Sequence, residues 1–294
     1  MDSVVKSILK KVADISDMPI GAYNIRVDGT SIGRESTSNI KIVPKQDKQG
    51  IDIYIKPNTK NEIVHIPVVI GKSGLTEMVF NDFHVGENCD IKIVAGCGIH
   101  NNGFDTSKHD GVHSFYVGEN SKVVYVEKHY GEGEGTGDNI FNPITIIDLK
   151  ENSYLEMETV QIEGVDYTDR VTKGKIGDNA KLVVKEKLMT SGKQIAKTMF
   201  EIELDGEGSS ANIMSRSVAK GSSVQEFLSK INGNNKCAGH SECDAIIMDD
   251  SSVKAIPEIT ANHIDASLIH EAAIGKIAGE QITKLMTLGL DQEE

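Results

Sequence analysis

The sequence predicts an all-β core built as a β-helix, a solenoid of stacked strands, with a short α-helix at each end. Polar turn signals followed by alternating apolar residues recur along most of the chain. No helical segment of useful length lies between residues 20 and 270, which disfavours α/β units. A β-sandwich is the alternative architecture, and the regular turn-plus-strand unit favours the solenoid.

The chain opens with an amphipathic pattern over residues 3–17, where Val4, Ile8, Val12 and Ile15 recur at helical spacing. We therefore expect an N-terminal helical segment within residues 1–20. From Ala22 onward the pattern changes to apolar–polar alternation, which predicts short strands. The β-helix core is expected to span residues 21–271.

The strongest architectural signal is a repeat. Four copies align, and their starts are separated by 32, 32 and 27 residues. Each copy is a Gly/Asn/Asp turn that leads into a strand with alternate apolar residues, and one such strand cannot bury its apolar face alone. The four copies begin at Gly86, Gly118, Lys150 and Gly177, and looser copies begin at Gly206, Lys220 and Asp249.

The chain is predicted to close with a helix over residues 272–294, because apolar residues again recur at helical spacing. This helix and the opening helix would cover the exposed ends of the solenoid. Its apolar face is expected to contain Ile274, Ile277, Ala278, Ile282, Leu285 and Leu288.

Charge and composition exclude several classes of function. With 31 Lys and Arg against 44 Asp and Glu, the net charge of −13 disfavours nucleic acid and anionic membrane surfaces as partners. The sequence contains neither an apolar run long enough to span a membrane nor a signal-peptide core, so we expect a soluble cytoplasmic protein. Four scattered cysteines do not form a disulfide framework, and we expect reduced thiols.

A first group of possible metal ligands lies in the middle of the chain. A C-x-x-H pattern is followed by H-x-x-x-H, which resembles zinc-ligand spacing, and stacked coils could bring Cys97, His113 and His129 together. The alternative is a chance cluster of polar loop residues. The candidate ligands are Cys97, His100, His109, His113, Glu127 and His129.

The glycine-rich run Gly131–Gly137 does not have the features of a phosphate-binding loop. It lacks the Lys-Ser/Thr pair of a P-loop, and its two glutamates would repel phosphate. We interpret it as a flexible turn between coils.

The stretch from Cys243 to Glu271 is the second candidate site. It supplies a thiol, an imidazole at His270 and a carboxylate at Glu271, and then leads into the predicted closing helix. A thiolate is the ligand that iron–sulfur clusters and sulfur carriers require. Cys243 could equally be a buried core residue, and His270 and Glu271 could be a surface pair.

Residues 236–290 resemble the SufB/SufD family, scaffold subunits of the SUF iron–sulfur cluster assembly machinery. The matching stretches are Cys243-Asp-Ala-Ile-Ile, Ile269-His-Glu-Ala-Ala and Gly279-Glu-Gln-Ile-Thr-Lys-Leu-Met-Thr-Leu-Gly-Leu. The segment from Cys97 to Tyr130 is similar to that of the short, archaeal-type SufB-like members. The chain departs from the family pattern at Ile269, where the family has a glutamate.

The resemblance implies a right-handed parallel β-helix that acts as a scaffold and not as an enzyme. It implies pairing with a second copy or a SufB/SufD paralogue, and docking of a SufC-like ABC ATPase on the terminal helices. A sulfur donor and iron would supply a transient iron–sulfur cluster. Cys243 matches the family's essential cysteine, and His270 and Glu271 match its interface residues.

Two other functions remain open at this stage. The chain could be a SufD-like support subunit that binds no cluster. It could also be a β-helix enzyme that acts on polysaccharide, which the absence of Trp and the presence of only seven Phe and seven Tyr disfavour.

Overall fold

The computed structural model describes residues 3–276 and Thr287, and in this part of the chain it contains one helix and 20 strands. The helix α1 spans Ser3–Ala13. The strands are β1 Ala22–Val27, β2 Thr30–Glu35, β3 Ile40–Pro44, β4 Gly50–Ile55, β5 Lys60–Ile70, β6 Thr76–Val85, β7 Asp90–His100, β8 Ser107–Val117, β9 Lys122–Glu132, β10 Asn139–Phe141, β11 Ile144–Leu149, β12 Tyr154–Glu163, β13 Tyr167–Ile176, β14 Lys181–Thr190, β15 Ile195–Leu204, β16 Ser210–Ala219, β17 Val224–Gly233, β18 Ala238–Ile247, β19 Ser252–Ala261 and β20 Ser267–Gly275.

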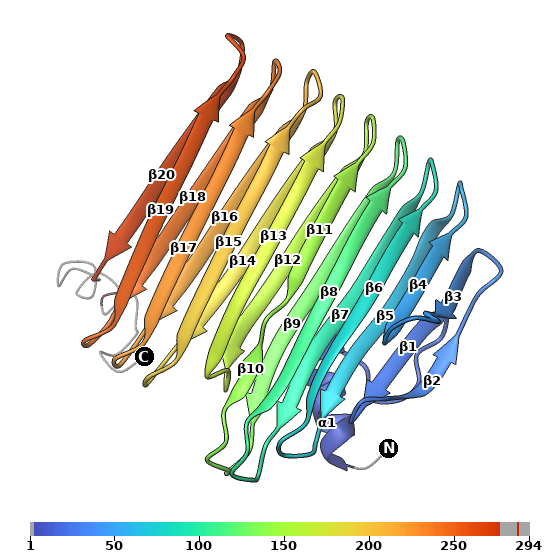
Figure 1. Ribbon diagram of the computed structural model, residues 1–294, viewed down its shortest axis with the longest axis vertical. Coiled ribbons are helices and arrows are strands. Elements are labelled where there is room, and N and C mark those ends of the chain that lie inside the picture. The colour runs from blue at the N-terminus through green and yellow to red at the C-terminus, as the bar shows by residue number, and fades with distance from the viewer. Residues whose placement is uncertain (1–2, 277–286, 288–294) are drawn as a thin grey trace.

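The strands form a parallel β-solenoid, as the repeat predicts. Two 10-stranded sheets face each other, and from β4 onward the chain alternates between them, so each coil adds one strand to each sheet (Figure 1). One sheet runs in the order β2-β1-β5-β7-β9-β12-β14-β16-β18-β20. The other runs from β19 to β3, and in it β10 and β11 together occupy the place of one strand between β8 and β13. Among the described strands, antiparallel pairing is confined to β1 with β2 and β3 with β4, at the N-terminal end of the solenoid.

The backbone conformation of the turns explains why an asparagine recurs in the repeat. The asparagine of each of the four clear copies, at positions 88, 120, 152 and 179, has a φ between 52° and 56°. Asparagine tolerates this left-handed conformation better than most residues, so it can turn the chain from one sheet to the other. The turns stack through backbone hydrogen bonds, for example from Asn88 N to Glu119 O at 2.9 Å.

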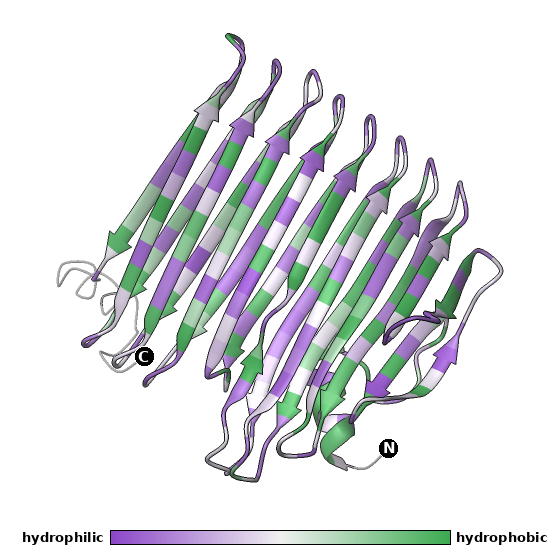
Figure 2. Ribbon diagram, in the orientation of Figure 1, coloured by the Kyte–Doolittle hydropathy of each residue, from purple (hydrophilic) through white to green (hydrophobic). Residues whose placement is uncertain are grey.

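Apolar side chains at alternate positions of each strand fill the interior of the solenoid. Figure 2 shows hydrophilic and hydrophobic bands following one another along most strands, which is the pattern expected when successive side chains point to opposite faces of a sheet. The buried cluster extends along the solenoid and includes the stacked rings of Phe83 and Phe115, whose centroids are 4.6 Å apart. Tyr125 packs edge-on against Phe115.

Helix α1 packs against the outer face of one sheet and not over the end of a coil. Its buried residues include Ile8 and Val12, and it lies against β5, β7 and β9. Two glycines of β7 make this close approach possible, because a Cβ on Gly96 would lie 2.3 Å from the Val12 carbonyl oxygen and one on Gly98 2.1 Å from Ile8 Cγ2. The helix ends at Ala13, four residues before the end that the sequence predicts.

We expect Gly96→Ala to lower the free energy of unfolding by about 1–3 kcal/mol, because the added methyl group displaces the helix backbone. The measurement is urea unfolding together with limited proteolysis after residue 13. Gly275→Ala is the matched control, because no atom of the described residues lies within 4 Å of its added Cβ. Equal stability of the two variants would contradict this account of the helix contact.

The predicted closing helix requires a correction at its start. Strand β20 continues to Gly275, so residues 272–275, including Ile274, lie in the sheet. Alternation continues through this segment, and pairing with β18 satisfies the backbone as a strand. Residues 277–286 and 288–294 of the predicted helix fall outside the described residues. No helix in the described part of the chain is long and apolar enough to cross a membrane.

Gly131 and Glu132 end strand β9, and residues 133–137 form the turn between coils that the sequence predicts. The glycines of this turn allow close packing. A Cβ on Gly133 would lie 2.1 Å from the Asn101 carbonyl oxygen, and one on Gly137 would lie 2.1 Å from that of Asp105. Gly135 N also donates to Asn101 O at 3.0 Å. The loop therefore stacks directly on the loop of the preceding coil.

Candidate functional site

The interior of the solenoid contains a polar section between its aliphatic ends. Residues that pair in register in neighbouring strands form a column along the inner face of a sheet. One column passes from Ala95 through Glu127, Thr159, Glu186 and Ser215 to Cys243. All of these side chains are buried. Buried carboxylates and hydroxyls require partners, and those partners define two candidate sites.

The first site surrounds Cys97. Cys97 on β7 pairs in register with His129 on β9, and His109 approaches from β8 in the opposite sheet. The Cys97 thiol contacts both imidazoles, and each of the three residues is at most 4% exposed. Nδ1 of His109 lies 3.0 Å from Glu77 Oε1, whereas its Nε2 is buried without a well-formed hydrogen bond. The sequence predicts that stacked coils bring Cys97, His113 and His129 together. The structure pairs Cys97 with His129 in register, and no interaction of the described residues joins His113 to Cys97.

A buried ionic group lies next to this thiol. Arg170 on β13 donates from Nη1 to Glu127 Oε2 at 2.5 Å and from Nη2 to His129 Nδ1 at 3.2 Å. Its Nε lies 3.8 Å from Glu186 Oε1. The hydroxyl of Tyr125 donates to Glu127 Oε1 at 3.0 Å. One guanidinium is therefore shared by two carboxylates that burial alone would penalise heavily.

The electrostatics of the first site favour charged groups despite burial. Burial alone would raise the pKa of the Cys97 thiol, but nearby His109 and His129 lower it below its usual value. Burial would lower the pKa of His109, yet Cys97 and Glu77 raise it to about 10. For Glu127, Arg170 and His129 outweigh the opposing effect of burial and hold the pKa well below its ordinary value. The Cys97 thiol and the His109 imidazole thus favour a thiolate–imidazolium pair.

The other predicted ligands of this group are engaged elsewhere. His100 lies at the end of β7, where its Nδ1 is 3.1 Å from Glu132 Oε1. His113 faces the interior four residues after His109 on β8, stacked on Phe83, and burial lowers its pKa to about 4. Neither ring contacts Cys97 among the interactions of the described residues. Metal binding by the predicted six-residue set stays a prediction. Within the described residues, the Cys97 thiol contacts only His109 and His129 of that set.

The second site contains Cys243, which is 1% exposed on the inner face of β18. Its column neighbours are Ser215 and Ala272, and Ser215 Oγ donates to Glu186 Oε2 at 2.6 Å. Burial, followed by the negative charges of Glu186 and Asp244, raises the pKa of the Cys243 thiol to about 11. In this arrangement Cys243 is a neutral thiol, in contrast to Cys97.

His270 and Glu271 point to opposite faces of β20, because they are consecutive residues of a strand. His270 pairs in register with buried Ser241 and therefore shares the inner face with Cys243. Glu271 lies on the outer face, where its Oε2 is 3.5 Å from His240 Nε2. Within one chain the structure therefore brings the imidazole, and not the carboxylate, to the side of the thiol.

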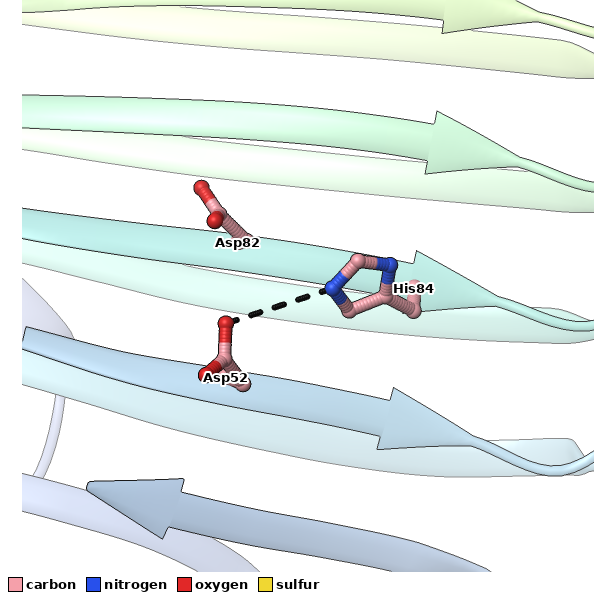
Figure 3. Close-up of side chains that lie close together, drawn as sticks. All are labelled: Asp52, Asp82 and His84. Atoms are coloured by element: carbon pink, nitrogen blue, oxygen red, sulfur yellow. Dashed lines mark ion pairs between the residues drawn. The ribbon is translucent and has the colours of Figure 1, made fainter. Parts of the chain in front are cut away.

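A third group of donor atoms lies on the outer face near the first coils. Asp52, Asp82 and His84 form the one group in the described residues whose metal-ligating atoms all lie within 4.8 Å of one another (Figure 3). Asp52 and Asp82 are register partners in β4 and β6. Lys45 forms ion pairs with both carboxylates, so the position between them is already held by an ammonium group.

Sequence reasoning missed the residues that complete the first site. Glu77 and Arg170 lie 20 or more residues before and after the Cys97–His129 segment and have no motif of their own. A usable signal was available for Arg170: it occupies an inward position of an alternating strand, and a charged residue there needs a buried partner. The same alternation would have separated His270 from Glu271.

The comparisons with known proteins agree with one another. A family model described as "SUF system FeS cluster assembly, SufBD core domain" matches residues 71–294. An iron–sulfur cluster assembly SufBD family protein of Methanothermobacter thermautotrophicus is 29% identical over 76% of this chain and 54% of its own length. Proteins with the same description in Archaeoglobus fulgidus and Pyrococcus horikoshii are 26% and 27% identical over 86% and 90% of this chain, and over 68% and 80% of their own lengths. The chain thus spans about half the length of the Methanothermobacter relative.

Proposed function

The chain belongs to the SufBD family of the SUF iron–sulfur cluster assembly system, and from that premise we propose that it is a scaffold on which a cluster is built at Cys243 and then released. The cluster is cargo in this proposal, and the chain is not itself an enzyme. The observation that carries the proposal is the position of Cys243, a thiol on the inner face of β18, one strand from the last strand of its sheet.

Pairing with a second copy or a paralogue is supported by the strands at this end. β19 and β20 are the last strands of the two sheets, and their outer edges have no strand partner among the described residues. If two copies paired edge to edge, three strand spacings would separate their Cys243 residues, about 14 Å. That distance is too long for one small cluster, so assembly requires the last coils to rearrange.

A SufC-like ABC ATPase is the partner that would drive this rearrangement. We propose that it docks on the residues after Gly275 and uses ATP to move the two scaffold copies relative to each other. Cys243 would then be exposed, lose its proton and accept iron and sulfur from separate donors. His270 would add an imidazole from the same inner face, whereas Glu271 would contribute a carboxylate from the outer face of the paired copy.

The proposal is tested with the full-length chain under anaerobic conditions. Iron, sulfide and the partner ATPase with ATP are supplied, and the visible spectrum, the iron content and transfer to a cluster-free acceptor protein are measured. We expect a labile chromophore that moves to the acceptor. Light scattering of the chain alone should give the mass of two copies, and a monomer that loads and transfers a cluster would rule out the paired arrangement.

A support subunit that binds no cluster is the second candidate function. The specific observation in its favour is the state of Cys243, which is buried and whose pKa is raised to about 11, as for a cysteine that only packs in a core. A wild-type chain that acquires no acid-labile sulfide and no cluster chromophore, either alone or with the ATPase and ATP, but still pairs with a cluster-binding paralogue, would establish this alternative.

A further inference from the structure

We propose that Cys97, His109 and His129 bind one divalent first-row transition-metal ion inside the solenoid. This site shares no residue with the Cys243 site. It does not rest on the proposed function, because its argument uses only the geometry and the donor chemistry around Cys97. The ligand class is an ion such as zinc or ferrous iron that accepts sulfur and nitrogen donors.

The first argument is that three strands deliver the donors to one place. Cys97 and His129 are register partners on one sheet, which sets their backbones one strand spacing apart, about 4.8 Å. His109 faces them from β8 of the other sheet, and the Cys97 thiol contacts both rings. All three side chains are buried.

The second argument is the state of His109. Its ring is 2% exposed, Nδ1 is held by Glu77 at 3.0 Å, and Nε2 has no well-formed hydrogen bond. Buried polar nitrogens rarely lack a partner, and a histidine whose other nitrogen is bound by a carboxylate is the usual form of a metal ligand. A metal ion beside Cys97 would give this nitrogen its partner. Glu77 is itself held by Arg26 Nη2 at 3.0 Å, which fixes the carboxylate.

The third argument is the donor set. One thiolate and two imidazoles suit zinc-class ions and disfavour magnesium and calcium, which prefer oxygen. Three protein ligands leave a fourth coordination position for water or another small ligand. The three donor atoms do not all lie within 4.8 Å of one another, so an imidazole must turn toward the sulfur when the ion binds. Metal–ligand bonds offset the cost of such a movement.

The other candidate donors are committed to different partners. Glu127 is bound by Arg170 and Tyr125, and His113 stacks on Phe83. The outer group of Asp52, Asp82 and His84 contains no sulfur, and Lys45 already neutralises its carboxylates. A sulfur-to-metal signal therefore excludes the outer group, and the Cys243→Ser variant separates the Cys97 site from the second buried thiol.

The test is a titration of the metal-free, full-length chain with Co²⁺ under anaerobic, reducing conditions, following the thiolate-to-cobalt charge-transfer absorption. We expect one equivalent to bind to the wild type and to Cys243→Ser. The absorption should be lost in Cys97→Ser, and Glu77→Gln should weaken binding by about 10- to 100-fold because it removes the group that orients His109. Matched controls are Cys89→Ser, which removes another buried thiol, and His113→Asn, which removes a neighbouring buried imidazole.

Several outcomes would overturn the proposal. They are a charge-transfer band that survives in Cys97→Ser, its loss in Cys89→Ser, and Co²⁺ binding without any thiolate band. Zn²⁺ and Fe²⁺ are then each added to the cobalt form, and displacement identifies the preferred ion; if neither displaces Co²⁺, zinc and ferrous iron are both wrong as the ion of this site. Zn²⁺ should also raise the unfolding temperature of the wild type and not that of Cys97→Ala, a readout that does not depend on colour.

The result is separable from the proposed scaffold function. Cys97→Ser is expected to lose Co²⁺ binding and to retain cluster loading at Cys243. Failure of the metal site therefore leaves the cluster assay unchanged, and failure of the cluster assay leaves the Co²⁺ titration unchanged.

Discussion

Cys243→Ser should abolish cluster loading: after anaerobic incubation with iron, sulfide, the ATPase and ATP, the variant is expected to hold no more iron than a sample without sulfide. A serine hydroxyl is a poor ligand for iron, whereas it matches the size of the thiol. It can also hydrogen-bond with Ser215, its column neighbour, so the coil should remain folded. Iron and acid-labile sulfide are measured after gel filtration, with a circular dichroism spectrum as the folding check.

Cys237→Ser is the matched control for this experiment. Cys237 is also buried and lies in the turn that leads into β18, so it removes a thiol from the same coil. We expect it to load a cluster as the wild type does. Wild-type loading by Cys243→Ser would show that Cys243 only packs in the core, and the support-subunit function would then replace the scaffold function.

Arg170→Met should lower the free energy of unfolding by about 3–5 kcal/mol at neutral pH, because it leaves two buried carboxylates without their cation. Glu127 loses its hydrogen-bonded partner, and Glu186 loses the charge that lies 3.8 Å away. The measurement is urea unfolding at pH 7. Arg216→Met is the control: Arg216 is 67% exposed and pairs with Glu242 at 3.4 Å, and such surface pairs contribute about 0–1 kcal/mol.

The loss of unfolding free energy caused by Arg170→Met should become smaller as the pH is lowered. The pKa of Glu127 in the folded protein lies well below its ordinary value, chiefly because Arg170 and His129 outweigh the cost of burial. A carboxyl group whose pKa is lower in the folded protein stabilises the folded state at pH values above its pKa in the unfolded chain, about 4.3. That stabilisation is lost as the pH falls through the pKa of the folded state. The variant lacks most of this contribution, so its deficit should be large at pH 7 and shrink as the pH falls below 4. A deficit independent of pH would assign the effect to lost packing.

The fold could be predicted because its determinants are local. The conformation of each Asn-containing turn and of each alternating strand depends on residues close by in the sequence. The strands then stack into a β-helix because one strand alone cannot bury its apolar face. The register pairing of Cys97 with His129 follows from the 32-residue spacing of the two coils that carry them. The end of α1 was less predictable, because its last expected turn, up to Asp17, adds charged residues and little apolar surface.

The site was only partly predictable because its partners are distant in sequence. Glu77 and Arg170 reach Cys97 and Glu127 through coils whose lengths had to be known first. His100 was included on spacing alone, and the structure places it at the strand end with Glu132. The opposite orientations of His270 and Glu271 follow from strand alternation, which a motif match does not take into account.

Each coil of the solenoid adds the same rise, about 4.8 Å, so the number of coils between two residues gives their separation along the axis. Cys97 and Cys243 lie on the same sheet, on strands separated by five spacings, which places their coils about 24 Å apart along the axis. No single cluster can use both thiols of one chain at that separation. The position of each cysteine along the axis is therefore set by the coil that carries it, and the two sites are independent of each other. Inserting or deleting one whole coil between them would change their separation in a step of about 4.8 Å and leave the immediate neighbours of each unchanged.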